Sequence, residues 1–105
     1  MEKDLPPFLK KVIGRYPHVW QKYDELKGTI LSIDALDEKT QSLVKLAIAV
    51  GAGREGSVHS HARKCKKMGI PNEELFQTAL LAITTIGWSG AMAALSWIND
   101  VVDDL

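Results

Sequence analysis

The stretch from Gly53 to Gly69 carries the side chains best suited to chemistry. It contains two of the three histidines and the only cysteine of the chain. If this stretch is a helix, each residue turns by about 100°. One stripe then carries four polar or reactive side chains and three apolar ones: Arg54, Ser57, His61 and Cys65 with Val58, Ala62 and Met68. A guanidinium, a hydroxyl, an imidazole and a thiol are therefore expected to face inward among apolar neighbours.

His61 is the candidate for acid–base chemistry on this stripe, because imidazole is the side chain most easily tuned to work near pH 7. Ser57 lies one helical turn before His61 and can orient a ring nitrogen. Arg54 lies two turns before it and can hold a carboxylate. The same spacing also suits a core histidine satisfied by Ser57 or by a backbone carbonyl. Residue spacing alone leaves both interpretations open.

Metal binding and thiol redox chemistry find less support in this stretch. His59 and His61 are two residues apart, which places them on nearly opposite faces of a helix, unlike the i, i+4 pair of metalloproteases. Cys65 has no second cysteine to resolve an oxidised thiol. It is either a small buried residue or a thiol that His61, one turn earlier, activates. The sequence predicts no metal site and no cofactor.

The composition limits the class of protein. The chain has 105 residues, which suits one domain over residues 1–105, and its 13 basic residues balance 13 acidic ones. This balance argues against a nucleic-acid partner, and no apolar run reaches the roughly 18 residues of a membrane span. A single cysteine suits a reducing compartment, and the N-terminus lacks the apolar core of a signal peptide. We therefore expect a soluble cytoplasmic protein without a membrane partner.

Helical signals recur along the chain, whereas the sustained alternation typical of strands is missing. Two short N-terminal helices are predicted within residues 6–28, the second opening at Pro17. A linker over residues 29–36 separates them from the core helices, which are predicted within residues 37–100. Asp37 is expected to cap the first core helix.

The core helices are expected to end at glycines. The first ends at Gly51 and Gly53, the second is the stretch described above and ends at Gly69, and the third is broken by Gly87. The fourth runs from about residue 89 to residue 100. The sum is an all-α domain of about six helices. The first and third core helices are apolar on most faces, so one small core cannot hide them and subunit association is expected.

Several of these residues together resemble a known family. The segments that carry the resemblance are Lys39-Thr40-Gln41-Ser42-Leu43, Gly53-Arg54-Glu55, His61, Gly69 and Glu73-Glu74-Leu75. They are similar to the carboxymuconolactone decarboxylase family, which includes the alkylhydroperoxidase D-like proteins, over roughly residues 37–98. The resemblance implies an alkylhydroperoxidase D-like helical fold that assembles as a homo-oligomer, a trimer or hexamer, with active sites near subunit contacts.

The peroxidase branch of that family carries a glutamate on the third helix, then Cys-x-x-Cys, then a histidine four residues after the second cysteine. The corresponding positions here are Ser42, Arg54, Ser57 and His61, so only the histidine is present. Cys65 is not at a motif position. The resemblance therefore implies that thiol-dependent peroxide reduction by that mechanism is lost, and this alternative is disfavoured.

The decarboxylase branch fits better. Its typical residues are matched by Ser42, Gly53, Arg54, Glu55 and His61, whereas its His-Glu pair is replaced by Gly56-Ser57. This resemblance implies a lyase that decarboxylates a small carboxylated lactone or a related acid. In that role Arg54 anchors a carboxylate, His61 delivers a proton, and Glu55 orients Arg54 or His61 across a subunit contact. The replaced pair leaves open a non-catalytic oligomeric or ligand-binding protein.

Overall fold

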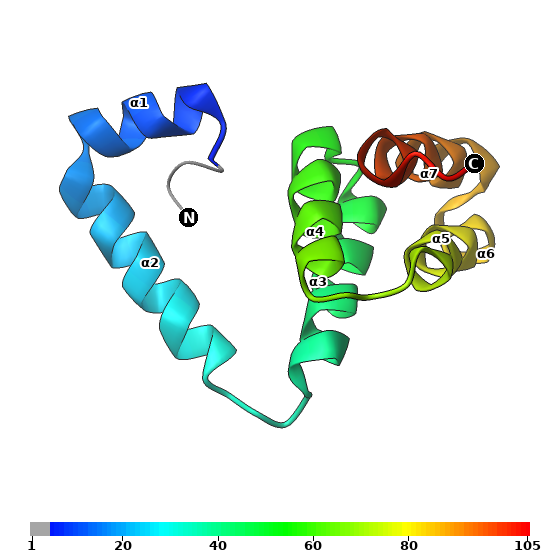
Figure 1. The fold of residues 1–105 in the computed structure, drawn as a ribbon, viewed down its shortest axis with the longest axis horizontal. Coiled ribbons are helices and arrows are strands. Elements are labelled where there is room, and N and C mark those ends of the chain that lie inside the picture. The colour runs from blue at the N-terminus through cyan, green and yellow to red at the C-terminus, as the bar shows by residue number, and fades with distance from the viewer. Residues whose placement is uncertain (1–4) are drawn as a thin grey trace. The chain divides into compact units, whose positions relative to one another are not determined.

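The computed structural model describes residues 5–105, which contain helices and no strand (Figure 1). The helices are α1 (Pro7–Arg15), α2 (Pro17–Leu31), α3 (Glu38–Ala52), α4 (Glu55–Lys67), α5 (Asn72–Leu81), α6 (Ile83–Ile86) and α7 (Trp88–Val102). The prediction of an all-α fold is confirmed. A turn at Ala82 divides the third predicted core helix into α5 and the single turn of α6.

The contacts divide the chain into two compact units, and the division falls between Ala35 and Leu36, at the end of the predicted linker. The first unit holds α1 and α2. None of its described residues is buried, so it has no apolar core of its own. Four exposed apolar residues follow one another along α2 at intervals of three or four: Val19, Tyr23, Leu26 and Ile30. This α2 stripe is the apolar face that the unit leaves uncovered.

In the second unit, α3 and α4 form a hairpin whose ends follow from local chemistry. The Asp37 side chain accepts a hydrogen bond from the Thr40 backbone N–H at 2.8 Å, which confirms the predicted cap. Hydrogen bonding to Thr40 also holds the pKa of the Asp37 carboxyl below its usual value. The cap is therefore present at neutral pH and is lost as the pH falls through that lowered pKa.

Glycines in the left-handed region end both helices of this hairpin. Gly53 has a φ of 66° and Gly69 a φ of 78°, a conformation that residues with a Cβ rarely adopt. After α4, the N–H of Ile70 donates to the carbonyl of Cys65 at 3.1 Å. After α3, the N–H of Arg54 donates to the carbonyl of Ala49 at 3.2 Å in the same way. The chain can therefore reverse between Ala52 and Glu55, which brings α4 alongside α3 (Figure 1).

The core of the second unit lies where α3, α4, α5 and α7 meet. Its fully buried side chains of largest volume are Leu46, Leu75, Ile98, Val50, Val58 and Cys65. Only one face of α3 belongs to this core, because Val44 and Ile48 are 41% and 65% exposed. The expected burial of α3 on all sides therefore does not arise within a single chain.

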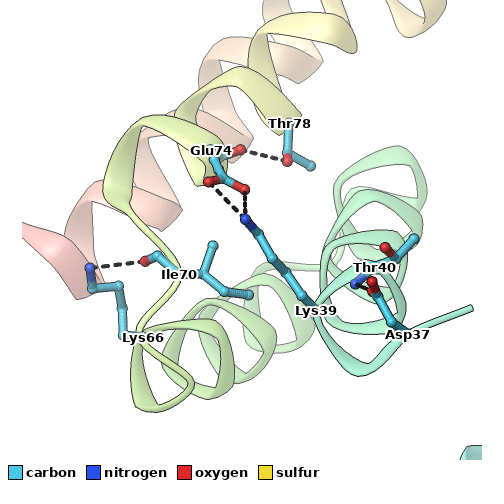
Figure 2. A network of polar contacts seen from close by, with 7 residues as sticks. All are labelled: Asp37, Lys39, Thr40, Lys66, Ile70, Glu74 and Thr78. Atoms are coloured by element: carbon cyan, nitrogen blue, oxygen red, sulfur yellow. Dashed lines mark hydrogen bonds and ion pairs between the residues drawn. The ribbon is translucent and has the colours of Figure 1, made fainter.

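Polar contacts tie the helices of this unit together at its surface. Lys39 on α3 forms an ion pair with Glu74 on α5, with 2.8 Å between Nζ and Oε1 (Figure 2). Lys66 donates to the Ile70 carbonyl at 3.3 Å and so braces the connection from α4 to α5 (Figure 2). No described helix combines the length and the apolarity that crossing a membrane requires.

Candidate active site

A pocket of about 250 Å³ opens between α3 and α4 in the second unit. Its lining residues are Lys45, Ile48, Ala49, Ala52, Arg54, Ser57 and His61. At about 30 Å³ per water molecule, the pocket has room for roughly eight waters. That volume lies just below the range of about 300–1,000 Å³ for drug-sized ligands and suits a small organic acid.

The hairpin explains why these seven residues meet. Lys45, Ile48, Ala49 and Ala52 follow the i, i+3, i+4, i+7 pattern along one face of α3. On the other arm, Arg54 stands at the N-cap of α4, and Ser57 and His61 follow one and two turns later. Because the two helices run in opposite directions from Gly53, their facing stripes line the pocket, which is open to solvent.

His61 opens onto this pocket and is only partly buried, as is Ser57, whereas Arg54 is exposed. The predicted stripe of Arg54, Ser57 and His61 is therefore a real shared surface. His61 is half-buried and does not belong to the fully buried core. A histidine that faces a cavity beside a guanidinium can meet a bound acid, whereas an enclosed one cannot.

Glu55 does not line the pocket with the other predicted site residues. It is exposed in the first turn of α4, where a carboxylate interacts favourably with the positive end of the helix dipole. A single chain therefore gives Glu55 no contact with the cavity. Its expected role across a subunit contact stays a prediction.

Ser42 and Cys65 also lie outside the lining of the pocket. The Ser42 hydroxyl donates to the Met68 sulfur at 2.9 Å, and the Cys65 thiol donates to the Ser42 carbonyl at 3.7 Å. Cys65 is 0% exposed, and desolvation by burial raises the pKa of its thiol. A raised pKa disfavours the nucleophilic thiolate. Of the two roles that the sequence left open for Cys65, the structure favours packing.

This burial makes Cys65→Ser an informative variant. We expect serine to lower the free energy of unfolding by about 1–3 kcal/mol, because its hydroxyl loses water on entering an apolar core. Chemical denaturation measures this change, and Cys65→Ala separates loss of the sulfur from gain of a hydroxyl. We expect neither variant to alter turnover. Peroxide reduction that is present in the native protein and vanishes in Cys65→Ser would contradict this interpretation.

Lys45 is the pocket residue that sequence reasoning missed. It lies on an α3 that reads as apolar on most faces, so a single lysine there looks like an ordinary surface residue. The available signal was its spacing, because Lys45 precedes Ile48 and Ala49 by three and four residues on the stripe that faces α4. Only the packing of α3 on α4 shows that this stripe lines a cavity.

The lining of the pocket carries positive charges and no negative charge. Lys45 and Arg54 bring two cations to its lining, His61 brings an imidazole, and no lining residue carries a carboxylate. Within residues 5–105, no carboxylate forms an ion pair with Lys45 or Arg54. The described residues also include no group of three or more His, Cys, Asp or Glu side chains placed to hold a metal ion. The cavity is therefore suited to an organic anion.

Comparison with known proteins finds sequence similarity over most of the chain. The model of the carboxymuconolactone decarboxylase family matches residues 17–100. A 4-carboxymuconolactone decarboxylase of Acinetobacter baylyi is 31% identical over 78 residues, which are 74% of this chain and 58% of that protein. The chain thus spans little more than half the length of that relative.

Proposed function

Since the chain belongs to the carboxymuconolactone decarboxylase family, we propose that it is a lyase that decarboxylates a small carboxylated lactone or a related acid without a cofactor. The observation that carries this proposal is the shared pocket of Arg54, Ser57 and His61. An anion-binding group and an acid–base group face one cavity of small-molecule size. That is the minimum that a decarboxylation of this kind requires.

The proposed reaction uses these side chains in sequence. Arg54 holds a carboxylate of the substrate through charge-assisted hydrogen bonds. The bond between the substrate carbon and its departing carboxylate breaks, carbon dioxide leaves, and the electron pair remains as a dienolate. Protonated His61 donates its proton to a carbon of that dienolate and regains a proton from solvent. In this proposal Ser57, which lines the pocket with Arg54 and His61, orients the substrate or the imidazole.

Arg54→Gln tests the binding half of this mechanism. Hydrogen bonds to charged groups contribute about 1.5–3 kcal/mol, so we expect KM to rise by about 10- to 150-fold while kcat changes less. The measurement is carbon dioxide release from a panel of carboxylated lactones and β-keto acids. Arg63→Gln is the matched control, because Arg63 is an exposed arginine on α4 that does not line the pocket. Equal effects of the two substitutions would argue against a specific role of Arg54.

The proposed active form is a homo-oligomer of the cytoplasm, a trimer or a hexamer. None of the described residues of the first unit is buried, and the α2 stripe is exposed along its length. Ile48 lines the pocket while remaining 65% exposed, so a neighbouring subunit can close this side of the cavity. In this assembly we propose that Glu55 of one copy orients Arg54 or His61 of another.

A non-catalytic ligand-binding protein is the second candidate. It is favoured by Gly56-Ser57, which stand where the decarboxylase branch typically has a His-Glu pair. Position 57 lines the pocket, so the replacement removes an acid–base side chain from the cavity itself. This alternative predicts saturable binding of organic acids without turnover on the same panel. Turnover by the native protein would exclude it.

A further inference from the structure

Lys45 has no role in the decarboxylation proposed above, yet it lines the same pocket. It is a half-buried side chain on a helix face otherwise occupied by Ile48, Ala49 and Ala52. Burying part of a lysine beside apolar residues has a cost when no carboxylate compensates the charge. None of the lining residues is acidic. No acidic residue within residues 5–105 forms an ion pair with Lys45.

The hairpin places Lys45 and Arg54 at different ends of the pocket. Lys45 lies eight residues before Gly53 and His61 lies eight residues after it, so the two are level with each other across the antiparallel helices. Arg54 stands at the turn. At 1.5 Å per residue, about 12 Å of helix separates the backbone of Lys45 from the turn. The long side chains of Lys45 and Arg54 can therefore reach into the pocket from its two ends.

We propose that Lys45 is a second anion-binding residue of this pocket, which holds an acid group of the ligand at the His61 end while Arg54 holds another at the turn. Two cations that share a small cavity repel each other, and a ligand with two acid groups relieves this repulsion at both ends. A ligand with a single acid group relieves it at one end only. Lys45 thus determines selectivity for molecules with two separated acid groups. The inference rests on the proposed function, because it concerns the ligand of the same site.

The test compares ligands that differ by one charge at nearly constant shape. Succinate, glutarate and adipate are titrated into the full-length protein by calorimetry, each beside its monomethyl ester. We expect the best diacid to bind at least about tenfold more tightly than its monoester, as a charge-assisted hydrogen bond implies. In Lys45→Gln this ratio falls to about one, and in Lys45→Arg most of it is retained.

Arg63→Gln is again the control, since it removes one positive charge from α4 outside the pocket and is expected to leave the ratio unchanged. Three results would overturn the proposal. The first is a ratio of diacid to monoester affinity in Lys45→Gln that equals the ratio of the native protein. The others are an equal loss of affinity for diacids and monoesters in Lys45→Gln, and no binding of any diacid to the native protein. If decarboxylation requires His61 but the ratio of diacid to monoester affinity does not depend on Lys45, this inference fails and the proposed function stands. A Lys45-dependent ratio without turnover would do the opposite.

Discussion

Replacing His61 by glutamine is expected to lower kcat by about 10²- to 10⁴-fold, the usual contribution of a positioned general acid. Glutamine keeps hydrogen-bonding groups in the half-buried position but cannot cycle a proton near neutral pH. In the proposed mechanism, the dienolate left after loss of carbon dioxide must then take its proton from water. Because Arg54 still holds the carboxylate, we expect KM to change much less than kcat. Single-turnover measurement of carbon dioxide release separates the two steps.

His59→Gln is the matched control for this experiment. His59 lies on the same helix but pairs with Asp100, with 2.9 Å between Nε2 and Oδ2, and does not line the pocket. Both variants are compared by thermal unfolding, so that a folding defect is recognised separately. Turnover that survives His61→Gln at the native rate would rule out His61 as the proton donor.

Placing two carboxylates on the α2 stripe is expected to convert the proposed oligomer into monomers. Leu26→Glu combined with Ile30→Glu puts two charges on the C-terminal half of an apolar surface that the proposed assembly buries. Each lost apolar contact weakens association by about 25 cal/mol per Å² of buried apolar area, and an unpaired buried charge costs considerably more. Light scattering coupled to size-exclusion chromatography measures the mass directly.

Gln21→Glu is the control for the α2 stripe, because it adds a negative charge to the opposite face of α2. We expect it to leave the mass unchanged. A native protein that runs as a monomer would contradict the proposed assembly, and so would an unchanged mass of the double variant. If the sites lie near subunit contacts, the dissociated protein should also lose turnover.

Helix positions followed closely from local sequence, and the differences have local reasons. Pro17 opens α2 and Asp37 caps α3, as their chemistry predicts. The predicted end of α2 at Gly28 was wrong, because the helix continues to Leu31. A glycine inside a helix costs only about 1 kcal/mol, so it ends a helix reliably only where the chain also turns, as at Gly53 and Gly69.

The spacing of residues 54, 57 and 61 predicted that their side chains share a surface, and the structure confirms this. The same stripe included Cys65, which the structure places in the core instead. A helical stripe is wide enough to meet two neighbours, and its period does not say which side chains face a cavity and which meet another helix. The packing of α4 against both α3 and α7 determines which of its side chains are buried in the core and which line the pocket.

What the sequence by itself determined is the helical class, the glycines that end α3 and α4 and the alignment of Arg54, Ser57 and His61, because each depends on residues close together in the chain. Only the tertiary structure showed that this alignment borders a cavity, that Cys65 is closed off from it and that Lys45 enters it. Those facts depend on how α3 packs against α4, and helix packing is set by side chains that are distant in sequence. The α2 stripe extends the same reasoning, because local periodicity shows an apolar face and only a packing partner can cover it.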